Sequence, residues 1–482
     1  MVHAPVLTDL PSELLHLIFG HFCLHCRGGF REPYFVEKDA GHDQSEAYLR
    51  DRHSLFSLCL VSRRMRDVAQ HVLHHEFVLG YAHLQRRWTY SWRGRLTSFI
   101  RTVSTRRDLA ALVKTVFFHP LLQEGVELGD AWLAMRHAAD ALQVDLAEVW
   151  KRRELDDMSW RMPRVDYELA RELFLGPLHS INRVTRPRDL VALVTELFAV
   201  LLALLPNLKH LAFGTDIGVG VLLWSPAAMS ALGVTKLPLR VFESNFRPGE
   251  LSKLMPDLES LTCDRLGDHE KFSFPRLKSL CIRDICLGKW DLGKIAGFCP
   301  ESLSSFTYET GGSWGGSLSI VQPSDVVAQL SKLHGTLKSL HLDFRSKLIL
   351  PRDIRTDFPC LEAFTVLESL FLTNNVIYHD SNLELPDEDS LVDILPPSIV
   401  SLTLAKTGWP TPTQRLMRGL LGLAEYKRRN PERFRKLKFV RSDIKQVCSD
   451  SSVKEAFGKA GIDLVYGEFP RKDWSYNDIY DH

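Results

Sequence analysis

Two cysteines and two histidines stand close together near the N-terminus, and thiolates and imidazoles are common zinc ligands. They are His21, Cys23, His25 and Cys26. A structural zinc site needs four converging ligands, typically supplied as two spaced pairs, and no second Cys-x-x-Cys pair follows here. Cys23 also continues the apolar pattern of the preceding helical stretch. We therefore expect no metal site and interpret Cys23 as a packed core residue.

A glycine-rich stretch at residues 311–316, Gly-Gly-Ser-Trp-Gly-Gly, could form a phosphate-binding loop. Such a loop leads into a helix N-terminus, and the Walker version carries a lysine. Leu318 and Ile320 follow with neither signature. We interpret the stretch as a surface loop of the kind that can carry recognition on a rigid scaffold.

No set of side chains has the spacing that catalysis demands. The sequence shows no nucleophile elbow, no Ser/His/Asp order and no paired carboxylates that stand out. Isolated groups at 268–270 and 378–380 have no such spacing, and Cys281 and Cys286 fall in and just after a predicted strand. We therefore expect no catalytic residue and no cofactor in this chain.

Arginines and aromatic residues alternate within the segment 86–107, which is the main indication of a nucleic-acid-binding surface. Basic grooves with stacking rings bind single strands, and twelve arginines but three acidic residues lie between Arg50 and Arg107. The whole chain has 60 Lys+Arg against 59 Asp+Glu, so the remainder is net acidic and can pair with these arginines. We favour a structural role as a basic, aromatic helical linker at 78–107. A nucleic-acid-binding or scaffolding protein is the alternative.

The composition is typical of a folded intracellular protein. The chain has 482 residues, 45% of them hydrophobic, and a net charge near zero that favours neither nucleic acid nor an anionic membrane. Its nine cysteines are odd in number and irregularly spaced, which indicates reduced thiols. The most apolar stretch, 190–205, carries Glu196 and is shorter than a membrane span of about 20 residues, so we interpret it as a buried helix. With no secretory signal at its start, we expect a cytoplasmic or nuclear protein with no membrane partner.

The first of the elements that position these residues is a helix beginning at Pro11. Proline suits the first helical turn, and Glu13 lies favourably near the positive end of the helix dipole. Apolar residues then cover about 200° of the helix circumference, whereas packing on one core needs roughly 100°. They are Leu14, Leu15, Leu17, Ile18, Phe19 and Phe22. This helix, which we expect to reach about Cys23, therefore has two surfaces to pack against.

Residues 25–52 interrupt the pattern with polar residues, glycines and a proline, and we expect an inserted loop there. Periodicity resumes at Leu55, and Ser62 is placed to cap a further helix. The expected inner face of that helix contains Met65, Val68, Ala69, Val72 and Leu73. Three short helices make a core that is marginal by itself, so a permanent partner on the spare apolar face would stabilise it.

The N-terminal segment resembles the F-box family in a motif that runs Leu10-Pro11-x-Glu13-Leu14-Leu15-x-x-Ile18-Phe19, then Leu55-x-x-Leu58-x-Leu60-Val61-Ser62-Arg63 and Arg66-x-x-Ala69. It departs from the family at Met65, where tryptophan is common, and in the long stretch between the first two helices. The resemblance implies a three-helix module that inserts apolar side chains into the Skp-type adaptor subunit of a ubiquitin ligase. The implied docking residues are Leu10, Pro11, Leu14, Leu15, Ile18, Phe19, Leu58 and Val61.

The body of the chain repeats a short strand of the form Leu-x-x-Leu-x-apolar. Copies begin at Val113, Leu208, Leu258, Leu277, Leu303, Leu337, Leu367 and Ile399. Helical stretches precede some of them, at 187–204, 249–255 and 324–333, and helix–strand units at 413–440 and 451–466 follow. Such a unit cannot bury its apolar face alone, so stacked units form a solenoid. An ordinary α/β domain is the alternative.

These patterns predict an α/β chain that resembles fungal F-box proteins with degenerate leucine-rich repeats. We expect a three-helix F-box at 8–77, an irregular leucine-rich-repeat-like solenoid at 108–470 with a helical insertion at 119–205, and a flexible tail at 471–482. The resemblance implies a substrate adaptor that binds a Skp-type subunit and, through it, a cullin scaffold. An unknown target protein would lie on the repeats, and ubiquitin transfer would belong to partner subunits.

Overall fold

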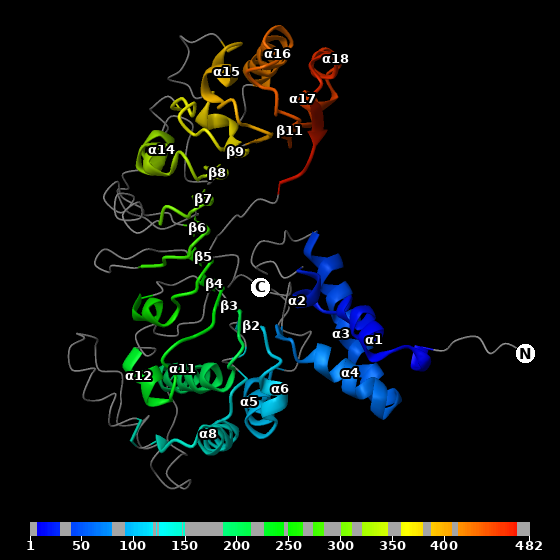
Figure 1. Cartoon of the computed structure of the whole chain (residues 1–482), viewed down its shortest axis with the longest axis vertical. Coiled ribbons are helices and arrows are strands. Elements are labelled where there is room, and N and C mark those ends of the chain that lie inside the picture. The colour runs from blue at the N-terminus through cyan, green and yellow to red at the C-terminus, as the bar shows by residue number, and fades with distance from the viewer. Residues whose placement is uncertain are drawn as a thin grey trace, which may run out of the picture. The chain divides into compact units, whose positions relative to one another are not determined.

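The computed structural model describes the chain in segments that contain its helices and strands (Figure 1). These segments are residues 7–28, 40–79, 92–118, 122, 125–146, 148–149, 187–213, 226–244, 249–263, 273–283, 300–310, 321–345, 358–378, 387–406 and 413–469. Their fold is α/β, with twelve strands that follow one another in chain order in a parallel sheet. The chain divides into two compact units, Met1–Leu258 and Glu259–His482. This boundary falls inside the range 108–470 that we predicted as one solenoid.

The first unit begins with an N-terminal helical module of four helices. They are α1 (Ser12–Gly20), α2 (Leu24–Arg27), α3 (Ala40–Val61) and α4 (Arg63–Leu73). As predicted, the Ser62 side chain caps a helix, because it accepts a hydrogen bond from the backbone N–H of Met65. The first helix ends at Gly20 and not at Cys23, since Cys23 N–H donates three residues back, to the Gly20 carbonyl at 3.1 Å.

A shared apolar core holds α1, α3 and α4 together. Its buried residues are Leu15, Phe19, Cys23, Leu55, Met65, Val68, Ala69 and Val72. The predicted inner face of α4 is therefore confirmed, apart from Leu73, which is only partly buried against this core.

The prediction of an inserted loop over 25–52 is wrong where the structure describes it. Residues 24–27 form α2, and α3 already begins at Ala40; positions 29–39 lie outside the described residues. The polar composition suggested a loop, but Tyr48 is buried in a small cluster with Leu24, Val78 and Phe117. This tertiary packing supports a helix that the local sequence alone does not indicate.

The first unit continues with four parallel strands. They are β1 (Glu76–Phe77), β2 (Thr115–Phe118), β3 (His210–Phe213) and β4 (Val241–Ser244). The predicted copies at Val113 and Leu208 become β2 and β3. Neither β1 nor β4 was predicted as a strand, because β1 is two residues long and β4 ends in the polar pair Glu243 and Ser244.

The first unit also contains the helices α5 (Arg95–Thr105), α6 (Arg107–Ala110), α8 (Leu128–Leu142), α11 (Pro187–Leu204) and α12 (Pro226–Ala231), with a 3-10 helix at Gly249–Leu254. Of these, α8 and α11 lie within 119–205 and agree with the helical insertion predicted there, as far as that range is described. The side chains of α11 from Leu193 onward are nearly all buried, as predicted for the apolar stretch 190–205. Across the described parts of the chain, no helix has both the length and the apolar character needed to cross a membrane.

Among the residues that the structure describes, the second unit has eight strands with helices between them, and Figure 1 labels several of these elements. The strands are β5 (Ser260–Cys263), β6 (Ser279–Arg283), β7 (Ser305–Glu309), β8 (Ser339–Asp343), β9 (Ser369–Thr373), β10 (Ser401–Ala405), β11 (Phe439–Ser442) and β12 (Asp463–Tyr466). The helices are α14 (Pro323–Leu330), α15 (Ser390–Ile394), α16 (Thr413–Arg429), α17 (Lys445–Ser449) and α18 (Ser451–Ala460).

The predicted strand copies are aligned in one register. The second apolar residue of each copy pairs with its equivalent in the next strand, as Leu340 does with Leu370 and Leu370 with Leu402. These side chains are buried. In β6 to β10 the residue after each of them is half-exposed, whereas Phe117 of β2, Ala212 of β3 and Thr262 of β5 are buried. The strands β6 to β10 thus each have one more deeply buried side, which is the arrangement expected when successive units stack.

Candidate functional site

The N-terminal helical module exposes apolar side chains on two of its helices. On α1, Leu14, Leu17 and Ile18 are 45%, 68% and 38% exposed, and their spacing of three and four residues places them on one face. At the end of α3, Phe56, Leu60 and Val61 are exposed as well. We call these six residues the exposed apolar set. Clustered exposed apolar side chains are typical of an interaction surface.

Hydrogen bonds from α4 position the two helices that carry the exposed apolar set, α1 and α3. Arg64 donates a hydrogen bond to the carbonyl of Leu10, directly before α1. Arg66 Nε donates to the carbonyl of Cys59, near the end of α3, at 3.1 Å. The start of α1 and the end of α3 are therefore both fastened to the first turn of α4.

The structure divides the eight predicted docking residues by burial. Those on the outer surface are Pro11, Leu14, Ile18 and Val61. Those half-buried against the module core are Leu10 and Leu58. Leu15 and Phe19 are fully inside that core, because this side of α1 packs against α4. These two residues stabilise the module itself and lie away from its outer surface.

Three members of the exposed apolar set were missed by sequence reasoning: Leu17, Phe56 and Leu60. The signal for Leu17 was present, since it marks one edge of the wide apolar arc of α1, about 200° from Phe19. Phe56 and Leu60 are four residues apart and share a helix face. They are exposed because the other side of α3 packs against α4. The sequence spacing shows that the two residues share a face, but it does not show which face of α3 is buried.

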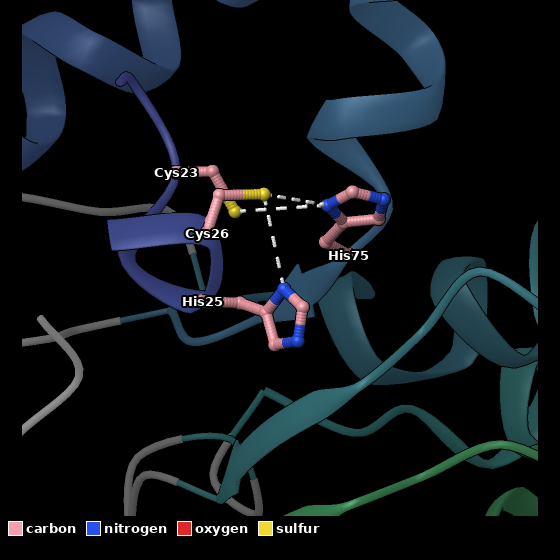
Figure 2. A group of neighbouring side chains, drawn as sticks. All are labelled: Cys23, His25, Cys26 and His75. Atoms are coloured by element: carbon pink, nitrogen blue, oxygen red, sulfur yellow. Dashed lines mark hydrogen bonds between the residues drawn. The ribbon is translucent and has the colours of Figure 1, made fainter. Parts of the chain in front are cut away.

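The structure brings Cys23, His25 and Cys26 together with His75, which follows α4 (Figure 2). The Nδ1 atom of His75 lies 3.2 Å from Cys26 Sγ and 3.9 Å from Cys23 Sγ, and His25 Nδ1 lies 3.8 Å from Cys26 Sγ. We expected no further ligand, since no second Cys-x-x-Cys pair follows. That reasoning was incomplete, because the fourth side chain is a lone histidine far along the chain.

The two thiols of this cluster differ in acidity. Hydrogen bonding to Cys26, followed by burial, raises the pKa of Cys23 to about 12. The hydrogen bond with Cys23 lowers the pKa of Cys26, although burial opposes this. Glu76 lies beside them, with Oε2 3.4 Å from Cys23 Sγ and accepting the His25 backbone N–H at 3.0 Å. The two thiols and two imidazoles of the cluster are the donor set of a tetrahedral metal site.

An aromatic and charged cluster lies on the half-exposed side of β8 and β9 in the second unit. The rings of His341 and Phe371 are stacked with centroids 3.8 Å apart. Arg345 lies over the Phe371 ring at 5.5 Å and donates from Nη1 to the carbonyl of Phe469 at 3.1 Å. Phe469 also meets Phe371 edge to face. Residues after β12 therefore return to this pair of strands and cover part of their surface.

Charged residues occupy one register position near the ends of three neighbouring strands, at Arg283, Glu309 and Asp343. Arg283 and Glu309 form an ion pair at 3.3 Å. Asp343 accepts hydrogen bonds from Arg345, the shortest at 2.6 Å. Burial raises the pKa of Asp343, but its interactions with His341 and Arg345 outweigh this and hold that pKa well below 3.8.

The described part of the arginine-rich segment consists of residues 92–107. Trp92 is buried, Arg93 pairs with Glu127, and Arg106 pairs with Asp108 at 2.6 Å. Arg107 donates to the Leu204 carbonyl at 3.0 Å. These contacts support the structural role that we favoured for the segment.

Comparison with known proteins leaves the function to be argued from the residues. No protein-family model and no curated protein matches this chain.

Several features named in the sequence lie outside the described residues: the glycine-rich stretch 311–316, Cys286, the group at 268–270, most of 86–92 and the tail from 471.

Proposed function

We propose that this chain is the substrate-recognition adaptor of a Skp–cullin–F-box type ubiquitin ligase. Its N-terminal helical module docks onto a Skp-type adaptor subunit and, through it, onto a cullin scaffold. Its strand array holds the target protein. The observation that best supports docking is the exposed apolar set, which lies on helices whose opposite sides already form a complete core.

The energetics favour a partner on this surface. Fully burying an exposed Leu or Ile contributes about 1.5–3 kcal/mol. The α1 members of the exposed apolar set are 38–68% exposed, so each has roughly 1 kcal/mol to gain from burial by a partner. The resemblance to the F-box motif suggests the identity of that partner. Leu15 and Phe19 are not part of the proposed surface, because they are buried in the module core.

The half-exposed side of the strands is the proposed target-binding surface. One register position carries a chemically varied row of side chains: Cys281, Thr307, His341, Phe371, Thr403 and Arg441. A rigid parallel array that presents different groups from strand to strand suits recognition of one protein surface. The aromatic and charged cluster at β8 and β9 is its most distinctive part.

The chain needs no catalytic residue in this role. Ubiquitin transfer to a target lysine is carried out by the partner subunits, and the adaptor contributes by holding the target near them. Such positioning accelerates a reaction by raising the effective concentration of the reacting groups.

Capture of a purified Skp-type subunit by the full chain tests the docking half of the proposal. Replacing Leu14, Leu17 and Ile18 together by Ala should weaken capture at least ~10-fold, because central apolar contacts dominate such interfaces. The thermal midpoint of the chain should change little, since these side chains are exposed.

Leu133→Ala on α8 is the matched control, because Leu133 is 41% exposed but lies outside the module. It should leave capture unchanged. Wild-type capture by the triple variant, or an equal loss in the control, would contradict the proposed docking surface.

A further inference from the structure

We propose that Cys23, His25, Cys26 and His75 bind one zinc ion in a structural site that fastens α2 to the start of the sheet. The four ligand atoms lie within 4.8 Å of one another (Figure 2). This inference is independent of the proposed function, because it concerns the folding of the first unit and not its partners.

The spacing of the ligand atoms fits a tetrahedral ion. Zinc–sulfur bonds of about 2.3 Å and zinc–nitrogen bonds of about 2.0–2.1 Å give tetrahedral edges between about 3.3 and 3.8 Å. The observed separations of 3.2, 3.8 and 3.9 Å involve both sulfurs and both Nδ1 atoms. At these three of the six edges, metal binding needs shifts of a few tenths of an ångström, and the other three separations are at most 4.8 Å.

The backbone holds the ligands on both sides of the site. Cys23 N–H donates to the Gly20 carbonyl at 3.1 Å, and the Cys23 carbonyl accepts from Arg27 N–H at 3.1 Å. The carbonyl of His75 accepts from both Lys114 and Thr115, at 2.7 and 3.1 Å. One half of the site is thus part of the α2 turn, and the other half is fixed to β2.

The donor set favours zinc over magnesium and calcium. Two thiolates and two neutral imidazoles suit tetrahedral zinc, whereas magnesium and calcium prefer oxygen ligands. Binding displaces the two thiol protons, so Zn²⁺ and two thiolates give a neutral centre. The buried carboxylate of Glu76 lies 3.4 Å from Cys23 Sγ. A neutral metal centre adds no net negative charge beside this carboxylate, whereas free thiolates would. Arg52, 3.8 Å from the same carboxylate, partly balances its charge.

The role is structural because four protein ligands leave no open coordination position for a substrate. A helix as short as α2 is not stable alone, yet it places Leu24 in a cluster with Tyr48 of α3, Val78 and Phe117. Zinc would hold this connection between the helical module and the first strands. The exposed side chain of Cys26 leaves a path for the ion to enter or for a chelator to remove it.

Cobalt(II) titration of the full chain, stripped of metal under reducing conditions, tests the proposal. One equivalent should produce the visible absorption of tetrahedral cobalt and a thiolate-to-metal charge-transfer band, and one equivalent of zinc should displace it. Cys26→Ser should weaken binding at least ~100-fold, because losing a ligand costs more than losing an outer-shell partner. Cys59→Ser, at a free cysteine of the same module, should bind as the wild type does.

A second variant guards against simple misfolding. His75→Cys retains four ligands, so it should still bind one cobalt ion, with a stronger charge-transfer band from its third thiolate. A chelator should lower the thermal midpoint of the wild type and leave that of Cys26→Ser unchanged. No stoichiometric cobalt complex in the wild type, or a Cys23–Cys26 disulfide in the reduced preparation, would overturn the proposal.

Discussion

Asp343 and Arg345 show how a single buried pair can stabilise the second unit. Their side chains are 12% and 7% exposed and are joined by several hydrogen bonds, from Nε at 3.0 Å and from the terminal nitrogen at 2.6 Å. Removing one partner of a buried pair leaves the other charge inside the protein. Removing either residue should therefore lower the stability of the fold, although their closeness in the sequence does not by itself show that the pair is buried.

Asp343→Ala should lower the free energy of unfolding by about 3 kcal/mol, because the Arg345 guanidinium then loses its buried carboxylate. Chemical denaturation of the full chain measures this. Asp108→Ala, which removes an exposed partner of Arg106, is the control and should leave the denaturation midpoint unchanged. Equal effects of the two substitutions would show that burial of the Asp343 pair adds nothing.

The same residue predicts a pH dependence. The pKa of Asp343 is lowered from 3.8 in the folded chain, so the unfolded chain binds the proton first as the pH falls. The stabilisation is therefore fully present above about pH 5 and is lost progressively below it. The stability difference between wild type and Asp343→Asn should shrink between pH 6 and about pH 3. A difference independent of pH would contradict this assignment.

Among the elements, α16 packs against the residues that precede α15 through a glycine. A Cβ atom at Gly422 would lie 2.6 Å from the carbonyl carbon of Glu388, which is backbone and cannot move aside cheaply. Gly458 in α18 has no atom within 4 Å of the equivalent position. Of these two helical glycines in the same unit, Gly422 therefore has no room for a side chain, whereas Gly458 does.

Gly422→Ala should destabilise the chain by about 1–3 kcal/mol, because the clash outweighs the better helix propensity of alanine. Gly458→Ala should stabilise it by about 0.5–1 kcal/mol for that same propensity. Thermal unfolding of both variants checks the pair. Stabilisation by both substitutions would mean that α16 does not pack closely at Gly422.

Across the whole molecule, the repeated register gives equivalent positions different environments. Leu402 in β10 and Leu464 in β12 occupy the same register position, linked through Val440 in β11. Leu402 is fully buried, whereas Leu464, on the last described strand, is only half-buried. Their shared register position alone would treat the two residues alike.

Leu402→Ala should cost about 2–5 kcal/mol, because it opens a cavity inside the stack. Leu464→Ala should cost about 1 kcal/mol or less, since water and local relaxation can fill the space. Denaturant titration of the full chain compares them. Similar losses would indicate that β12 is covered as completely as the internal strands.

Local patterns in the sequence predicted much of the fold. The alternation around Leu340, Leu370 and Leu402 depends on the pleat of a strand, so it predicted strands and their buried side. The capping role of Ser62 is equally local, since it depends on a backbone N–H three residues away. The short length of the apolar stretch 190–205, together with Glu196, likewise predicted a buried helix and not a membrane span.

The sequence by itself thus determined features that depend on near neighbours: caps, strand positions and the apolar sides of helices. Tertiary structure alone decided which side of each apolar helix is left exposed, placing Leu15 inside and Leu17 outside. It also decided that His75 joins Cys23 and Cys26. The physical reason is the same in both cases, because burial and convergence depend on segments that lie far apart in the chain and meet only when it folds.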